Sequence, residues 1–220
     1  MAEQNRVQWV YFSANNRELQ ERYDQWAATY DADLENDFGY IGPGGAANIF
    51  AKHVGTDTSV LDAGAGTGLV GKLLAEKGYE DIDAMDLSEG MLEEARKTGA
   101  YKAFHQMVMG ENLDFPDGAY DAVIAIGVLT IGHAPASSLD ELVRVTRPGG
   151  HVVFSMRPDI YESDGFKDKQ SQLESDGAWK FLEVSNPFKT LPTGYPDALS
   201  QIYVFRRTQT GAPEVTPCHP

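Results

Sequence analysis

The stretch VLDAGAGTGL, residues 60–69, decides the fold of this 220-residue chain. Its apolar start predicts a short buried strand, which ends in three closely spaced glycines, Gly64, Gly66 and Gly68. Glycine lets the backbone turn sharply and lets a ligand approach it closely. The apolar residues that follow recur at helical spacing, so a helix begins here with its free N–H groups near the turn. We therefore expect a strand–turn–helix unit that binds a ligand at its turn.

Strand-like and helix-like segments alternate along the rest of the chain. We expect further strands at residues 82–86, 102–108, 122–128 and 151–156, and helices after Ser88 and from about Ser138. Segments 181–184 and 202–205 predict two more strands, joined by the Pro-containing loop 186–197 and so paired antiparallel. This alternation indicates an α/β fold, a doubly wound and mostly parallel sheet with helices on both faces.

Aromatic residues mark the N-terminal region. Leu19, Tyr23, Trp26 and Tyr30 fall on one helical face and predict a helical cap over about residues 13–31. Together with the segments above, this indicates a single domain over residues 1–209. The Pro-rich tail, residues 210–220, is expected to be flexible.

Composition excludes several classes of function. With 33 acidic and 18 basic residues the net charge is −15, which disfavours nucleic acid or an anionic membrane surface as a partner. The single cysteine, Cys218, excludes an internal disulfide and Cys–His zinc clusters, and no metal site is expected. The chain shows neither a secretory signal nor a long apolar span. We expect a cytoplasmic protein with a small-molecule partner, either a monomer or a homodimer.

Asp86 ends the strand that follows the glycine turn. The carboxyl ends of neighbouring parallel strands share one edge of the sheet, so this side chain is expected to flank the turn. A carboxylate there can accept hydrogen bonds from both hydroxyls of a ribose. The sequence therefore predicts a nucleoside site.

Two cofactor classes use such a site. Gly66, Gly68 and Gly71 form the G-x-G-x-x-G fingerprint of dinucleotide-binding proteins, but it begins later after the strand than a diphosphate loop should. Asp62 would repel a diphosphate, whereas it suits a ligand with an ammonium group. A nucleoside with both a ribose diol and an amino-acid ammonium is S-adenosylmethionine. A nicotinamide-dependent reductase is the alternative.

With these features the chain resembles a class I S-adenosylmethionine-dependent methyltransferase, and more narrowly the methyltransferase-like proteins of the Williams–Beuren region type. The matching stretches within residues 20–165 are YDQWAATYDADL, LDAGAGTGLVGKLLAEKGY, DLSEGMLEEARKTGAY, FPDGAYDAVIAIGVLTIGHAP and LDELVRVTRPGGHVVFSMRPDIYE. The resemblance implies a seven-stranded Rossmann-like sheet of order 3-2-1-4-5-7-6 with only strand 7 antiparallel. It also implies S-adenosylmethionine as cofactor and S-adenosylhomocysteine as product, and it says little about the acceptor.

The resemblance further implies roles for individual residues. The three glycines of the turn would line the methionine part of the cofactor, Asp62 would lie near its ammonium, and Asp86 would hold the ribose. The remaining expected contacts are Tyr23, Tyr30, Ala63, Leu87 on the adenine, Met91, Met107, Val108 and Ile126. Val108 stands where the family commonly has an acidic residue for the adenine amino group. Either Met107 and Val108 supply apolar contacts there, or Glu111 substitutes.

The implied reaction is methyl transfer to a small acceptor by in-line displacement. His133, after the fourth strand, is a candidate base that takes a proton from the acceptor; the alternative is a solvated loop histidine. Arg157, just past the fifth strand, is a candidate clamp for a substrate carboxylate; the alternative is an ion pair with a surface acid. Phe188 and Tyr195 in the Pro-containing loop are candidates for the wall of a substrate pocket.

Two other functions fit the same motifs. A non-catalytic partner protein could bind S-adenosylmethionine without turning it over. A protein methyltransferase is the second, although the Asn/Asp-Pro-Pro-aromatic motif is missing after the fourth strand, which reads GVLTIGHAP. The small-molecule methyltransferase is therefore preferred.

Overall fold

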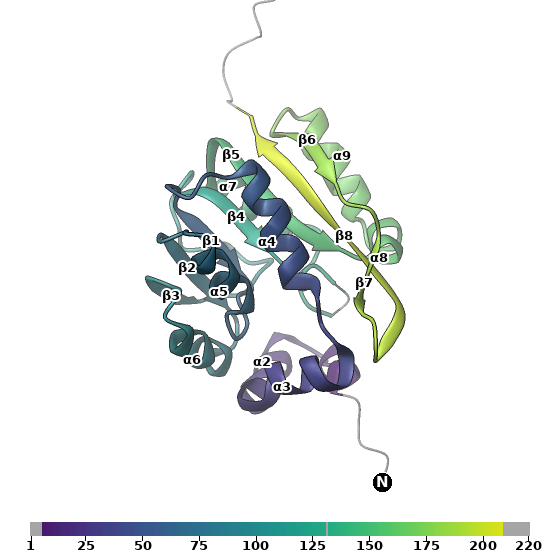
Figure 1. Ribbon diagram of the computed structural model, residues 1–220. Helices are drawn as coiled ribbons and strands as arrows, with labels where there is room; N and C mark the ends of the chain where they lie inside the picture. Colours follow the sequence, from purple (N-terminus) through teal and green to yellow (C-terminus); the bar gives the residue numbers. More distant parts are fainter. Residues whose placement is uncertain (1–5, 131, 209–220) are drawn as a thin grey trace, which may run out of the picture.

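A computed structural model of the chain describes residues 6–130 and 132–208 (Figure 1). Cys218 and the tail expected to be flexible, residues 210–220, lie outside the described residues.

One mixed sheet runs through the molecule in the order β3-β2-β1-β4-β5-β8-β6. Its strands are β1 (Val60–Ala63), β2 (Ile82–Asp86), β3 (Ala103–Gln106), β4 (Tyr120–Ala125), β5 (Thr146–Met156), β6 (Trp179–Val184) and β8 (Tyr195–Arg207). The first five strands pair in parallel, and β8 lies antiparallel between β5 and β6. The expected strand order is confirmed, with β8 in the place of strand 7.

The stretch 186–197 is a hairpin and not the expected loop. Strand β7 (Phe188–Leu191) pairs antiparallel with the first half of β8, so the sheet carries one more strand than expected. Two prolines that suggested a loop, Pro187 and Pro192, stand just outside β7, where no N–H is needed for the strand ladder.

Helices cover both faces of the sheet. Helices α4 (Gly42–His53), α5 (Leu69–Glu76) and α6 (Glu89–Thr98) cover one face, and α7 (Ser138–Val145), α8 (Pro158–Ser163) and α9 (Phe166–Ser175) cover the other. Successive strand residues point to opposite faces: Val60 and Ile124 pack under α4 and α5, whereas Leu61 and Val123 pack under α7. Both cores therefore contain fully buried aliphatic side chains, together with aromatic ones such as Phe50 and Phe154.

The N-terminal segment forms a cap at one end of the sheet, seen as α2 and α3 in Figure 1. It consists of α1 (Arg6–Tyr11), α2 (Asn16–Trp26), a 3₁₀ turn (Ala27–Thr29), α3 (Tyr30–Asp33) and a π turn (Leu34–Phe38). Asp24 of α2 accepts hydrogen bonds from the Ser88 hydroxyl and the Gly90 N–H, and Asp31 of α3 accepts one from the Thr67 hydroxyl. The cap is thus tied to the glycine turn and to the start of α6.

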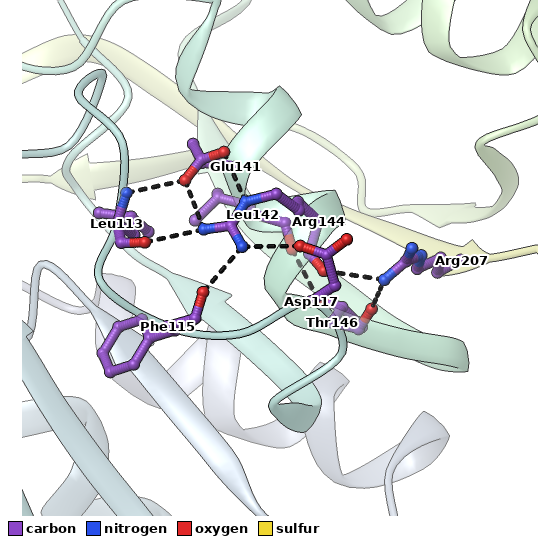
Figure 2. A network of polar contacts seen from close by, with 8 residues as sticks. All are labelled: Leu113, Phe115, Asp117, Glu141, Leu142, Arg144, Thr146 and Arg207. Atoms are coloured by element: carbon purple, nitrogen blue, oxygen red, sulfur yellow. Dashed lines mark hydrogen bonds and ion pairs between the residues drawn. The ribbon is translucent and has the colours of Figure 1, made fainter.

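Arg144 of α7 holds the connection between β3 and β4 (Figure 2). Its guanidinium donates to the carbonyls of Leu113 at 2.8 Å and Phe115 at 2.7 Å, and it pairs with Glu141 and Asp117. Glu141 in turn accepts the Leu113 N–H at 2.7 Å. The start of this connection lines the site described next. The network of Arg144 therefore helps to hold one wall of that site in place.

Within the parts of the chain that the structure describes, no helix has the length and apolar character to cross a membrane. Nor do three or more His, Cys, Asp or Glu side chains among those residues gather in a group that could hold a metal ion.

Candidate active site

The glycine turn adopts a backbone that other residues rarely take. Gly64, Gly66 and Gly68 have φ angles of 83°, 55° and 93°. A Cβ at Gly64 would stand 2.2 Å from the Val128 side chain. The Gly64 N–H donates to the Met85 carbonyl at 2.7 Å, which ties the turn to β2. All three glycines are therefore required by backbone conformation, and Gly64 by close packing as well.

Asp86 closes the other side of the turn. Its Oδ2 accepts the Gly66 N–H at 2.9 Å and its Oδ1 accepts the Ser88 N–H at 2.9 Å. Each carboxylate oxygen keeps a second lone pair for a ligand. The side chain is buried, and burial raises the pKa of Asp86 from 3.8 to about 6. The carboxylate is thus held in place beside the turn by backbone donors alone.

A cavity of about 620 Å³ lies against this turn. It is lined by the expected cofactor residues Tyr23, Tyr30, Gly64, Gly66, Asp86, Leu87, Met91, Met107 and Ile126. The walls are mainly apolar with one carboxylate, as is usual for a ligand pocket. We call this space the cofactor cavity.

Asp62 lies behind the turn, since it is not among the residues that line the cofactor cavity. It is 1% exposed and accepts a 2.7 Å hydrogen bond from the Tyr101 hydroxyl, whose oxygen accepts the Gly71 N–H at 3.1 Å. Burial raises the pKa of Asp62 to about 7. A Cβ at Gly71 would stand 2.2 Å from the Tyr101 ring, so this glycine of the fingerprint makes room for a tyrosine. Asp62 supports the turn through Tyr101.

Three other expected contacts also lie outside the lining of the cofactor cavity: Ala63, Gly68 and Val108. Ala63 is fully buried in the core, and Gly68 packs on Tyr101 and α6. Glu111 lines a separate open hollow beside the cavity, so the apolar Met107, and not Glu111, faces the cofactor cavity at this point.

The sequence pattern missed five residues of the cavity wall: Tyr40, Met85, Met109, Gly127 and Val128. Gly127 carried a usable signal, because a glycine that directly follows the most strand-like run marks the sheet edge where ligands bind. Tyr40 follows the cap in the sequence and approaches the cavity only through the tertiary fold.

A second cavity of about 740 Å³ adjoins the first beneath the cap. Both cavities are lined by Tyr23, Tyr30, Tyr40, Ile126 and Gly127. Its remaining walls are Val7, Val10, Tyr11, Trp26, Leu34, Gly42, Leu129, Thr130, Ser155, Met156, Arg157, Thr190, Leu191 and Ser200. We call this space the acceptor cavity, after the role that we propose for it below. Phe188 and Tyr195 are not among these residues; Thr190 and Leu191 of the same hairpin take that place.

His133 and Arg157 lie on different sides of this arrangement. His133 lines the cofactor cavity and the open hollow, and its Nε2 is 2.7 Å from the Tyr23 hydroxyl. Arg157 lines the acceptor cavity, and its Nη2 and Nε lie 2.6 and 3.1 Å from the carboxylate of Asp159. Arg157 therefore does form the ion pair with a surface acid that was the alternative to a role in substrate binding, and its partner is Asp159.

Comparison with known proteins places this geometry in a family. Residues 61–154 match the family model described as a methyltransferase domain. The chain is 34% identical over 167 residues to human methyltransferase-like protein 27, covering 73% of this chain and 67% of the relative. The chain belongs to the class I S-adenosylmethionine-dependent methyltransferases. This methyltransferase is also 34% identical over 149 residues to malonyl-[acyl-carrier protein] O-methyltransferase of Serratia marcescens, covering 65% of this chain and 54% of that one.

A solved structure shows the same fold. The 1,6-didemethyltoxoflavin-N1-methyltransferase of Burkholderia thailandensis, solved with S-adenosylhomocysteine, superposes with a TM-score of 0.63 at 18% identity, covering 90% of this chain and 92% of that one. The cofactor of this methyltransferase is S-adenosylmethionine. The residues present fit it, because the buried Asp86 carboxylate offers free lone pairs for a ribose in a cavity whose walls are mainly apolar.

Proposed function

We propose that this enzyme methylates a small molecule bound in the acceptor cavity. The observation that carries the proposal is the shared wall of the two cavities, which includes Gly127 at the end of β4. The two cavities adjoin at these residues, and Gly127 has no side chain to stand between a nucleophile in the acceptor cavity and the cofactor. Attack on the methyl group requires such access from the acceptor cavity to the cofactor cavity.

The chain's own residues mainly bind and position. Asp86 accepts the ribose hydroxyls, Gly64 and Gly66 let the methionine part lie against the backbone, and Leu87 with Met107 provides apolar contact for the adenine. S-adenosylmethionine supplies a methyl group on a sulfonium, which is electrophilic without further activation. Holding a nucleophile about 3–3.5 Å from that methyl, opposite the sulfur, is worth about 7–11 kcal/mol of the barrier.

We assign the acceptor's proton to the Tyr23–His133 pair. Tyr23 lines both cavities, whereas His133 is not among the residues of the acceptor cavity, so the histidine acts through the tyrosine. The acceptor passes its proton to the Tyr23 oxygen while Tyr23 passes its own to Nε2 of His133. A positioned base of this kind contributes about 10²–10⁴-fold when the nucleophile is protonated.

The cap supports a small acceptor over a protein. The acceptor cavity is built partly from α1 and α2, through Val7, Val10 and Trp26, so its ligand lies beneath the cap. Related enzymes named for ubiquinone biosynthesis and 1,6-didemethyltoxoflavin support the same broad class of acceptor.

The test is methyl transfer from labelled S-adenosylmethionine into a cell extract separated by size. We expect release of S-adenosylhomocysteine and label in the small-molecule fraction, both lost in Asp86→Ala and kept in Asp81→Ala, an exposed partner of Lys102. Label in the protein fraction alone would show a protein methyltransferase. Cofactor binding without release of S-adenosylhomocysteine would show a non-catalytic binding protein.

A further inference from the structure

The acceptor cavity has an unusual charge for this chain. Arg157 is the one charged side chain among the described residues that line it, in a protein whose net charge is −15. Most of the other walls are apolar, including Val10, Leu129 and Met156. A cavity of this kind favours an apolar body with one anionic end.

Donors gather around Arg157. Tyr11 lines the same cavity and, like Asp159, lies close enough to the guanidinium to raise the pKa of Arg157, and its phenol can both accept and donate a hydrogen bond. Thr130 follows β4, the neighbour of β5, whose end precedes Arg157. Its Oγ1 is buried in the cavity wall with no hydrogen-bond partner among the described residues. A buried hydroxyl without a partner is destabilising, and a ligand oxygen would supply that partner.

The guanidinium can serve both Asp159 and a ligand. Asp159 takes Nε and Nη2, and its side chain is 62% exposed and outside the cavity lining. An arginine has five N–H donors in a planar fork, so donors remain on the other edge of Arg157. A carboxylate bound there would share Arg157 with the carboxylate of Asp159, and the two carboxylates would repel each other.

The position of Arg157 separates the anion from the reaction. Arg157 is not among the residues of the cofactor cavity, and it does not belong to the wall that the two cavities share. A carboxylate on Arg157 is therefore an anchor, and the group that receives the methyl lies at the other end of the same ligand, beside Tyr23.

We infer that the acceptor is an apolar carboxylic acid whose carboxylate binds Arg157, Tyr11 and Thr130 and whose separate hydroxyl or amine receives the methyl group. This rests on the proposed function. The new O–C or N–C bond forms as the S–CH₃ bond breaks, the released electron pair stays on sulfur, and the acceptor's proton goes to the Tyr23–His133 pair. The carboxylate leaves the reaction unchanged, so the product is still an acid.

The experiment separates the small molecules of a cell extract by anion exchange after incubation with the enzyme and labelled S-adenosylmethionine. We expect the label in the anionic fraction, stable to mild base. After unreacted S-adenosylmethionine has been removed and the amines have been acetylated, label in the neutral or cationic fraction would overturn the inference while the proposed function stood. A neutral, base-labile product would show methylation of the carboxylate itself and would also overturn it. Label in no fraction would refute the proposed function instead.

Two variants then test the anchor on the labelled acid. Arg157→Gln should raise its KM tenfold or more with kcat largely kept, because one charge-assisted contact is lost away from the reacting atoms. Asp159→Asn should lower the same KM severalfold, because it removes the competing carboxylate. Equal KM values in wild type and Arg157→Gln would overturn the assignment. The affinity for S-adenosylmethionine, measured by calorimetry, should match wild type in both variants and shows that they fold.

Discussion

The Asp86 carboxylate accepts a 2.9 Å hydrogen bond from the N–H of Gly66, across 20 residues of sequence. This bond joins the end of β2 to the glycine turn and places the carboxylate on the wall of the cofactor cavity. Asp86→Ala should weaken binding of S-adenosylmethionine tenfold or more, since two charge-assisted bonds to the ribose are worth about 1.5–3 kcal/mol each. Calorimetry measures this, with Asp81→Ala as the control. A dissociation constant equal to that of wild type would refute the role of Asp86.

The affinity for the cofactor should depend on pH. Burial raises the pKa of Asp86 to about 6, and the ionised form is the better acceptor for ribose hydroxyls. Affinity should therefore rise from pH 5 to pH 7 and level off above, with protons released on binding below pH 7. Asp86→Asn should bind more weakly and with a flat profile. Calorimetry in buffers of different ionisation enthalpy checks both points, and an affinity that rises on acidification would contradict them.

The stability of the protein without cofactor should fall as pH rises, whereas its affinity for the cofactor should rise. The pKa of Asp62 is raised to about 7 and that of Asp86 to about 6, against 3.8 for each in the unfolded chain. Between pH 4 and pH 7 the folded protein thus binds more protons than the unfolded one, so the free energy of unfolding should fall as pH rises through this window. Urea unfolding at a series of pH values measures it. A stability that increases from pH 5 to pH 7 is the opposing result.

Tyr101 should matter for stability. Tyr101→Phe removes the donor to Asp62 and the acceptor of the Gly71 N–H, at a cost of about 1–3 kcal/mol. Gly71→Ala should cost more, because its Cβ would stand 2.2 Å from the Tyr101 ring. Tyr79→Phe is a matched control, since it removes a single bond from a buried tyrosine to a backbone carbonyl. Urea unfolding ranks the three, and a Tyr101→Phe protein as stable as wild type would show that Asp62 needs no such partner.

The Tyr23–His133 pair should control turnover. Tyr23→Phe and His133→Gln should each lower kcat about 100-fold, and the double variant little further, because the two side chains pass one proton. Tyr161→Phe, which lies outside both cavities, is the control. Full activity in Tyr23→Phe would show that the acceptor reacts without this base.

Local signals predicted the centre of the fold correctly. The three glycines between a strand and a helix, and the acid at the next strand end, each follow from backbone geometry, and the structure brings Gly66 and Asp86 into contact. The N-terminal aromatics at helical spacing correctly predicted a helix, since Trp26 is buried and Tyr23 and Tyr30 line the cavities.

Other features depend on contacts that a linear pattern does not contain. Helix α4, which begins with Gly42 and Pro43, was not among the expected helices, although proline suits a helix start and Phe50 packs fully into the core. Strand β7 was not expected, because the prolines on either side of it indicate a loop. Asp62 was expected to lie near the ammonium group. Its hydrogen-bond partner Tyr101 is 39 residues away in the sequence, so no local pattern indicates their contact.

A crystal structure with S-adenosylmethionine tests the central claim most directly. The account predicts the ribose hydroxyls on the Asp86 carboxylate, and the methyl group directed across the shared wall, between Tyr23 and Gly127, into the acceptor cavity. A cofactor bound elsewhere, or a methyl group directed away from that cavity, would contradict the arrangement on which the proposed reaction depends.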